Sequence, residues 1–523
     1  MIETVTTDVL VIGGGAAATR AALEASNLGV RVRLVDKGKP GYSGSSPLCL
    51  KGLVAPIAVE DSPLVLYQDW LKNGCGINDQ NLIWEAAIGA PANFIQLIQL
   101  GLEFNQKKEG GYVLYRGAGH SKARGLTVKF DHPDSNPVAT LAKEMSRQGV
   151  AIHTGIMMTK LLKVDGAIRG AIGISPSRKV YVFKAKTVVL ACGGATSIYA
   201  CVDDRIRGEK NRTSGDAFSL AYHAGAPIID IEFCNFREVP PGASRNGGRY
   251  LNALGERFME RYDPERLEKA PRQLMVAAIY NEFLEGRWPI HWEIDEEELK
   301  KDIVLYPRYH GKKRIEVAID FQRLLGGVRI NEKGETEVPH LFAAGESAGG
   351  LHGGDRLQGT AFLETQIFGS RAGLNAGKLA SETTEVDVDQ DMVDAEIARI
   401  DRIEGNVEPS ELTGTIQRMM WDHAGIIKNA DGLSKAQTLL LSLKKEKLPG
   451  VSGKNLFHAL ETQNLLLTAE MIVRAALARE ESRGSHRRSD FPHANDQKWK
   501  RHIAIREVDG EMSVTSLPIR LLK

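Results

Sequence analysis

Three consecutive glycines, Gly13, Gly14 and Gly15, lie between an apolar run at residues 8–12 and a helix-forming run that begins at Ala16. A second apolar run, residues 30–35, ends on Asp36. Glycines allow a tight turn and a close approach of pyrophosphate, the helix start offers free N–H groups, and a terminal acid holds a ribose hydroxyl. The spacing predicts a dinucleotide site, with NAD and FAD both open, made by Gly13, Gly14, Gly15, Ala16, Ala17 and Asp36. The alternative is a strand-to-helix turn that holds no ligand.

A second glycine-rich segment, residues 345–364, contains one acid, one histidine and one arginine before a helix expected at 365–376. Its glycines would let the backbone approach a flat ring. Glu346 is suited to a sugar hydroxyl, and the planar fork of Arg356 is suited to a carboxylate. The alternative is a glycine-rich structural loop in which Arg356 forms a surface ion pair.

Composition excludes several classes of protein. The 523 residues carry 67 basic and 66 acidic side chains, so nothing indicates a nucleic-acid or acidic-membrane partner. The five cysteines are scattered, without the spacing of a disulfide framework, a zinc site or an iron–sulfur cluster, and we expect no metal. No apolar run approaches the roughly 20 residues of a membrane span. Because the first strand is expected to start within the first ten residues, we expect no signal peptide. We expect a cytoplasmic protein, with attachment to a membrane only through a partner as the alternative.

Apolar patterns predict an α/β fold with a split cofactor domain. Residues 64–104 read as helices, and 150–162, 167–174 and 180–183 as a small antiparallel unit. Residues 187–194 form another buried strand that ends on Gly193 and Gly194. From residue 231 the chain becomes richer in Pro, Arg and charge, and residues 341–346 restore the strand–glycine pattern. The expected domains are 1–230 and 321–380 for the cofactor, 231–320 as an insertion, and 381–523 as a helical domain with a tail.

The sequence resembles a known family along nearly its whole length. Beyond the two glycine segments, the resemblance rests on residues 191–199, 214–227, 254–264 and 481–492. It is similar to the flavoprotein subunits of fumarate reductase and succinate dehydrogenase, with L-aspartate oxidase and the adenylylsulfate reductase α subunit. The resemblance implies FAD in a Rossmann-like domain, an inserted α+β capping domain and a C-terminal helical domain. It adds these expected FAD contacts: Lys37, Ser43, Gly44, Ser45, Gly193, Gly194, Asp216, Glu346, Thr360 and Leu363.

The resemblance also implies roles for two arginines. A substrate would lie between the capping domain and the flavin, where a hydride passes to or from flavin N5. Arg272 would donate or accept the proton, and Arg356 would clamp a substrate carboxylate. A guanidinium is an unusual acid unless its surroundings perturb its pKa. The alternative for Arg272 is an arginine on a helix surface.

Departures from the family bear on the substrate. The loop at residues 42–47 lacks the histidine that attaches FAD covalently, so we expect FAD to be non-covalent. Arg237 and Gln322 stand where the family has substrate-binding histidines, and residues 243–248 lack its Thr-Glu pair. His120 matches a loop near the flavin, where a structural histidine is an equally good interpretation. For His486, a hydrogen bond at a helix end is preferred to catalysis.

Together with these residues, the resemblance implies an FAD-dependent oxidoreductase that acts on a small anionic, carboxylate-bearing substrate. Electrons would be exchanged with a separate iron–sulfur subunit, with O₂ or a soluble carrier as the alternative. Chemistry like that of adenylylsulfate reductase or L-aspartate oxidase stays open. So does a flavin electron carrier with a vestigial substrate site.

Overall fold

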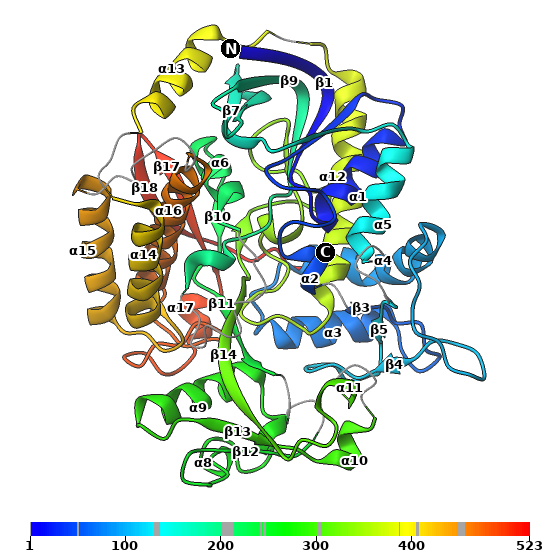
Figure 1. Ribbon diagram of the computed structural model, residues 1–523, viewed down its shortest axis with the longest axis vertical. Helices are drawn as coiled ribbons and strands as arrows, with labels where there is room; N and C mark the ends of the chain where they lie inside the picture. Colours follow the sequence, from blue (N-terminus) through cyan, green and yellow to red (C-terminus); the bar gives the residue numbers. More distant parts are fainter. Residues whose placement is uncertain are drawn as a thin grey trace.

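The computed structural model describes residues 2–49, 52–129, 136–199, 213–240, 243, 247–301, 306–385, 387–403, 407–446 and 456–522. Within these residues, a seven-stranded sheet forms the centre of the first domain (Figure 1). Its strand order is β6-β2-β1-β9-β8-β7, and β16 also pairs with β9. The strands are β1 (Ile2–Ile12), β2 (Val32–Asp36), β6 (Ala151–Thr154), β7 (Met157–Val164), β8 (Ala167–Ile174), β9 (Val180–Leu190) and β16 (Leu341–Ala343). The predicted order of strand, glycine turn, helix and strand is confirmed.

The expected antiparallel unit is part of this main sheet. Residues 180–190 form one strand, which pairs with β1 in parallel along its length and with β8 in the antiparallel sense through residues 180–184. Lys184 and Lys186 interrupt the apolar run, and for this reason the sequence suggested two strands. In the structure both lysines are only partly buried, while Phe183, Ala185 and Thr187 between and beside them are buried.

Two helices made largely of small residues cover the sheet next to the glycine turn. Helix α1 (Ala16–Ser26) packs against α12 (Thr360–Glu382). A Cβ on Gly369 would lie 2.8 Å from the carbonyl oxygen of Ala17, and one on Gly373 would lie 2.1 Å from that of Ala21. The helices therefore cross in backbone contact. Helix α12 begins at Thr360, earlier than the predicted residue 365, directly after Gly359 with φ +83°.

The remaining helices and strands of this domain surround the second glycine segment. They are α2 (Ser46–Cys49), α3 (Pro63–Asn73), α4 (Gln80–Gln99), α5 (Pro137–Arg147), α6 (Asp216–His223), and a small sheet of β3 (Gly52–Val54), β5 (Gly125–Thr127) and β4 (Leu114–Tyr115). Asp79 caps α4 by accepting hydrogen bonds from the backbone N–H groups of Asn81 and Leu82. The N–H of Asp79 in turn donates to the carbonyl of Gly350 at 2.8 Å, which joins the start of α4 to the glycine segment.

A second sheet extends away from the first domain at the lower end of the view (Figure 1). Its strand order is β11-β14-β13-β12, all antiparallel. The strands are β11 (Cys234–Val239), β12 (Arg249–Leu251), β13 (Ile290–Glu293) and β14 (Arg314–Leu324), and the helices are α8 (Met259–Tyr262), α9 (Arg272–Leu284), α10 (Glu296–Leu299) and α11 (Tyr306–Tyr309). Strands β11 and β14 carry the chain into and out of this sheet. We call this part, residues 234–324, the cap. Within residues 243–248, where the missing Thr-Glu pair was noted, 244–246 lie outside the described residues.

The C-terminal part consists of helices and a final hairpin. The helices are α13 (Gln390–Asp401), α14 (Pro409–Ala424), α15 (Ala430–Glu446), α16 (Leu456–Ala478) and α17 (Asp496–Trp499). The hairpin strands are β17 (His502–Val508) and β18 (Glu511–Leu517), and β17 pairs with β10 (Ile228–Ile229), which pairs with β15 (Gly327–Val328). The helical prediction did not include this hairpin. Its turn residues Asp509 and Gly510, with φ +50° and +81°, form the Asp-Gly signal that could have revealed it. No helix among the described residues is long and apolar enough to cross a membrane.

Candidate active site

The first glycine turn is packed so closely that side chains at Gly13 and Gly14 would overlap their neighbours. A Cβ on Gly13, where φ is +122°, would lie 2.2 Å from the carbonyl oxygen of Ala191. A Cβ on Gly14 would lie 2.4 Å from Oδ2 of Asp36. Gly15 precedes α1, and the N–H of Ala16 donates to Oγ of Ser46 at 3.3 Å. The turn therefore brings the end of β1, the start of α1 and the end of β2 together, as the sequence predicted. Ser46 was not predicted.

Asp36 is held in place beside this turn. The hydroxyl of Ser43 donates to Oδ2 of Asp36 at 2.9 Å, and burial raises the pKa of Asp36. The neighbouring Gly44 has φ +75° and no heavy atom within 4 Å of an added Cβ. The Oγ of Ser45 is buried without a hydrogen-bond partner among the described residues. A buried hydroxyl next to open space is a group that a bound ligand would satisfy.

Lys37 and Asp216 contact each other. Lys37 Nζ lies 2.8 Å from Asp216 Oδ2 and 2.6 Å from Glu461 Oε1, and it donates to Ser214 Oγ at 3.1 Å. Asp216 Oδ1 also accepts hydrogen bonds from Ser214 and Asn464. The network joins β2, α6 and α16. Contacts of Lys37 and Asp216 with FAD stay predictions, and the structure gives both residues a role in joining the first domain to the C-terminal helices.

The second glycine segment meets the first across the end of β9. A Cβ on Gly194 would lie 2.3 Å from Oε1 of Glu346, and Ser347 Oγ donates to the carbonyl of Gly193 at 3.1 Å. A Cβ on Gly345 would lie 2.8 Å from that of Ala17 in α1. We call these two glycine segments and the Asp36 loop the cradle. At the start of α12, Thr360 is fully buried and donates to the carbonyl of Leu357, and Leu363 is buried in the core.

Four arginines converge beside the cradle, and we call Arg237, Arg272, Arg323 and Arg356 the arginine cluster. Arg356 Nη2 donates to Oε1 of Gln322 at 3.0 Å. Burial and the charges of Arg272, Arg323 and Arg237 together lower the pKa of Arg356 to about 9, while the charge of Asp355 opposes them. The charges of the other three arginines therefore act on Arg356, which places the four side chains in one region of the structure.

Each of the other three arginines has an acidic neighbour. Arg272, the first residue of α9, places Nε 3.8 Å from Oε2 of buried Glu238. Arg237 Nη2 donates to Asp320 at 3.2 Å across the β11–β14 pair, and Arg323 lies 3.4 Å from Glu364. In Arg237, Arg272 and Arg356 the Nε atom is buried without a hydrogen-bond partner among the described residues. The cluster could therefore bind an anion.

Comparison with known proteins agrees with this geometry. Residues 8–362 match the family model described as FAD binding domain, and residues 413–522 match the model described as fumarate reductase flavoprotein C-term. The chain belongs to the fumarate reductase and succinate dehydrogenase flavoprotein family. It is an FAD-binding oxidoreductase, and the cradle, with its excluded Cβ positions and the orphaned hydroxyl of Ser45, fits that cofactor.

Members of the flavoprotein family match almost end to end. One subunit of the fumarate reductase (CoM/CoB) of Methanothermobacter marburgensis is 35% identical, over 95% of this chain and 96% of that protein. L-aspartate oxidase from Streptomyces coelicolor is 28% identical, over 95% and 91%. Among solved structures, E. coli quinol fumarate reductase covers 99% of this chain and 98% of its own, with a TM-score of 0.88 at 22% identity. Adenylylsulfate reductase from Archaeoglobus fulgidus covers 100% and 97%, with a TM-score of 0.82 at 21% identity. The two structures share the fold.

His120 lies in a network of its own. Arg124 Nη1 lies 3.2 Å from His120 Nδ1 and can only donate, so Nδ1 accepts and Nε2–H donates to the carbonyl of Gln358 at 2.7 Å. Burial lowers the pKa of His120 to about 4, so the ring is neutral. Arg124 is itself fixed by ion pairs to Asp61 and Asp69. The predicted contact of His120 with substrate would require one of these bonds to break.

Several site residues were not predicted from sequence. Asp355 accepts hydrogen bonds from Asn235, Gln273 and the N–H of Arg356. Burial raises the pKa of Asp355 to about 6. Glu364 lies 2.6 Å from His352 Nε2 as well as next to Arg323. An acid beside the predicted Arg356 was the available signal for Asp355.

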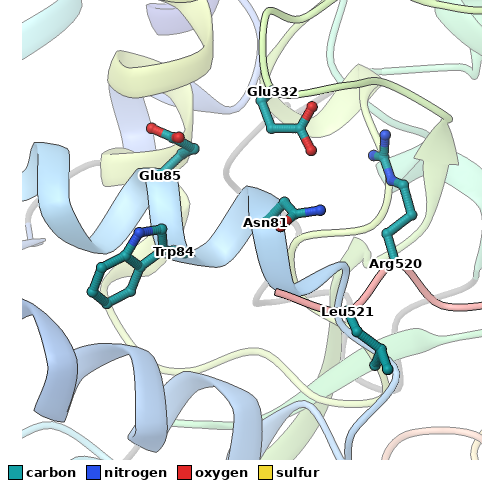
Figure 2. Close-up of a pocket in the computed structure, with 6 residues that line it drawn as sticks. All are labelled: Asn81, Trp84, Glu85, Glu332, Arg520 and Leu521. Atoms are coloured by element: carbon teal, nitrogen blue, oxygen red, sulfur yellow. The ribbon is translucent and has the colours of Figure 1, made fainter. Parts of the chain in front are cut away.

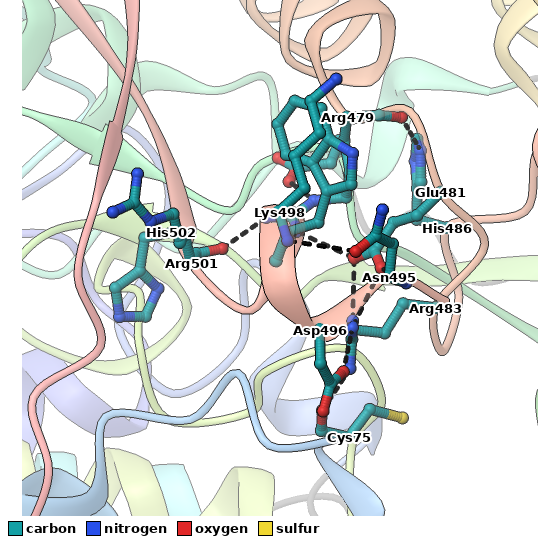
Figure 3. Close-up of polar contacts among 12 residues, drawn as sticks. Cys75, Arg479, Glu481, Arg483, His486, Asn495, Asp496, Lys498, Arg501 and His502 are labelled. Atoms are coloured by element: carbon teal, nitrogen blue, oxygen red, sulfur yellow. Dashed lines mark hydrogen bonds and ion pairs between the residues drawn. The ribbon is translucent and has the colours of Figure 1, made fainter. Parts of the chain in front are cut away.

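Residues 481–492 pack against the loop that carries Arg356 and hold it in place. The N–H of Ser485 donates to the carbonyl of Gly354 at 2.8 Å, and a Cβ on Gly484 would lie 2.1 Å from the same oxygen. Figure 3 shows Arg483 of this segment bonded to Glu481, Asp496 and the carbonyl of Cys75. His486 Nε2 bonds the carbonyl of Arg479 at 3.1 Å, the structural role preferred for it.

One cavity lies apart from this site. It encloses about 530 Å³ beside α4 and the C-terminal tail and shares no lining residue with the cradle or the arginine cluster (Figure 2). Its lining residues are Asn81, Trp84, Glu85, Glu332, Arg520 and Leu521. Arg520 is an anchor of the tail, because it pairs with Asp79 at the start of α4.

Proposed function

We propose that this chain transfers a hydride between flavin N5 and a small anionic, carboxylate-bearing substrate, as the flavoprotein subunit of an electron-transfer complex. The arginine cluster beside the cradle carries the proposal. Glu346 connects the two, because it lies against Gly194 in the cradle and feels the charges of the cluster. Burial raises the pKa of Glu346, and the charges of Arg323 and Arg356 oppose this rise. FAD, when bound, supplies the hydride chemistry.

Arg356 is the proposed carboxylate clamp. Its Nη2 is fixed by Gln322, while its Nε has no hydrogen-bond partner among the described residues. A guanidinium binds a carboxylate through two parallel N–H donors. Because burial and neighbouring cations lower the pKa of Arg356, an anion at this place would favour the charged form. We assign Gln322 and Arg237 as further substrate contacts. Gln322 accepts a hydrogen bond from Arg356, and the charge of Arg237 lowers the pKa of Arg356.

Arg272 is the proposed proton donor or acceptor. Its side chain is 14% exposed and its Nε lies 3.8 Å from Glu238, whose side chain is 1% exposed. A buried carboxylate beside a guanidinium gives the proton a second site within the protein. Arg272 begins α9 directly after Pro271, so the helix start fixes its backbone.

The electron partner follows from what the chain lacks and from its relatives. Its cysteines lack cluster spacing, and the 35% identical relative is named as one subunit of a fumarate reductase. We propose that the partner is an iron–sulfur subunit. FAD is proposed to be non-covalent, since residues 42–47 contain no histidine.

The test is anaerobic flavin absorbance of the purified protein with a substrate panel. Succinate, aspartate, and sulfite with AMP are added to oxidised protein, and fumarate to the reduced protein. We expect one carboxylate to change the flavin spectrum stoichiometrically, and expect Arg356→Gln to abolish the change while retaining FAD. A response to sulfite with AMP alone, or no response to any carboxylate, would contradict the proposal. FAD that stays with the precipitate after acid treatment would contradict non-covalent binding.

A further inference from the structure

The two proposed active-site arginines, Arg272 and Arg356, must be held together against their own repulsion. After burial, the charge of Arg272 is the largest influence that lowers the pKa of Arg356 to about 9. Arg272 lies in the cap, and Arg356 in the glycine segment of the cofactor domain. Repulsion between like charges favours separation of the parts that carry them. Some contact between the cap and the glycine segment has to oppose that separation.

A buried hydrogen bond joins the residues next to these arginines. Gln273 follows Arg272, Asp355 precedes Arg356, and Gln273 Nε2 donates to Asp355 Oδ1 at 3.2 Å. Asn235 Nδ2 from β11 donates to the same oxygen at 3.3 Å, and the N–H of Arg356 donates at 2.9 Å. Gln273 is 5% exposed, Asp355 8% and Asn235 0%. One carboxylate oxygen thus collects donors from two elements of the cap and from its own loop.

Both ends of this bond are rigidly mounted. The loop of Asp355 is fixed on its other side, because the N–H of Gly354 donates to the carbonyl of Gly74 and the carbonyl of Gly354 accepts from Ser485. Gln273 lies in the first turn of α9, and its amide also approaches the carbonyl of Phe236 at 3.5 Å. Any shift of α9 relative to the glycine segment must therefore stretch the Gln273–Asp355 bond.

We propose that Gln273 and Asp355 are positioning residues, whose hydrogen bond sets the distance between Arg272 and Arg356. The proposal rests on the proposed function for the roles of the two arginines, while the bond itself does not. A carboxylate is suited to this place, since it accepts several donors at once and its charge offsets two guanidinium groups. The bond therefore aligns the proton-transfer arginine with the substrate clamp.

The test compares two variants of the FAD-loaded full-length protein. Gln273→Leu keeps a similar side-chain volume but removes the donor, and leaves Asp355 bonded to Asn235 and the N–H of Arg356. The double variant Gln273→Glu with Asp355→Asn rebuilds one carboxylate–amide pair in the reverse order. Amide hydrogen exchange is followed by mass spectrometry in residues 272–280 and 351–358. We expect about tenfold faster exchange in Gln273→Leu and a return to within about twofold of wild type in the reversed pair.

Gln99→Leu is the matched control, because it makes the same substitution at an exposed residue, the last of α4, without touching the Gln273–Asp355 bond. It is expected to leave exchange in residues 272–280 unchanged. Unchanged exchange in Gln273→Leu, or a reversed pair no better than that variant, would overturn the proposal. With any substrate found in the panel, Gln273→Leu should lower kcat at least about tenfold with KM within about threefold. If the panel gives no substrate, the proposed function fails while the exchange data still decide the role of the bond.

Discussion

Gly14→Ala gives the sharpest test of the cradle. In the structure, an added Cβ would lie 2.4 Å from Oδ2 and 2.7 Å from Cγ of Asp36, and 3.1 Å from Cα of Pro40. Real Cβ contacts are ordinarily about 3.5 Å or more. Asp36 therefore has to swing away, and in doing so it leaves Ser43, which donates to the same Oδ2.

The expected loss follows from the size of this overlap. Overpacking a fixed site typically costs about 1–3 kcal/mol. If that cost falls on the FAD-bound form, the Kd for FAD rises about 5- to 150-fold. Titration of the FAD-free protein with FAD, followed by flavin fluorescence, measures the change.

A second glycine provides the control. Gly414 lies inside α14, and the nearest atom to an added Cβ is the flexible Nη1 of Arg418 at 3.4 Å. Gly414→Ala should leave FAD affinity unchanged and stabilise the helix by about 0.5–1 kcal/mol. Wild-type FAD affinity in Gly14→Ala would refute the reasoning that this turn lies against the cofactor.

Three further predictions concern charge. Arg124→Met should destabilise the protein by about 3–5 kcal/mol in denaturant unfolding, because it leaves Asp61 and Asp69 without their buried cation; a loss below about 1 kcal/mol would contradict this. The pKa of Arg356 is lowered to about 9, so its cation is lost as the pH rises through 9, and KM for a carboxylate substrate should rise about tenfold for each further pH unit; a flat KM up to pH 10 would be inconsistent with the assignment. The pKa of Asp355 is raised from 3.8 to about 6, so folding favours its protonated form and stability falls by about 3 kcal/mol as the pH rises between these values. Asp355→Asn should remove this fall, which unfolding at pH 4 and pH 7 would show.

The sequence was sufficient for the elements that have strong local signals. Gly13, Gly14 and Asp36 were predicted together because a strand, a tight turn and a helix can meet a pyrophosphate in few ways. The resemblance assigned both Arg356 and Gln322 to the substrate, and the structure brings their side chains to 3.0 Å. Local pattern and family order agree here, so the prediction needed no knowledge of the three-dimensional packing.

The contacts that the sequence did not give are those between distant segments. Asp355 and Gln273 are 82 positions apart, and neither residue type is unusual in a loop or a helix. The hairpin of β17 and β18 was missed because β17 joins a sheet whose other strands, at 228–229 and 327–328, are too brief to show a strand pattern. The ion pair of Lys37 with Glu461, which lies in a helix more than four hundred residues away, was also not predicted. Such partners depend on how distant segments pack together, and the local pattern of a single sequence does not reveal that packing.

The arginine cluster is electrostatically incomplete without an anion. Nε of Arg237, Arg272 and Arg356 is buried and has no hydrogen-bond partner among the described residues, and a buried donor left unpaired costs about 1–3 kcal/mol. The pKa of Arg356 reflects the same excess of positive charge, because the charges of Arg272, Arg323 and Arg237 add to burial in lowering it. Folding has already removed the three Nε–H donors from water. A carboxylate that binds there would accept their hydrogen bonds without first displacing water from them. If Gln322 contacts the substrate as proposed, we expect its bond to Arg356 to affect which anion can reach the unpaired donors.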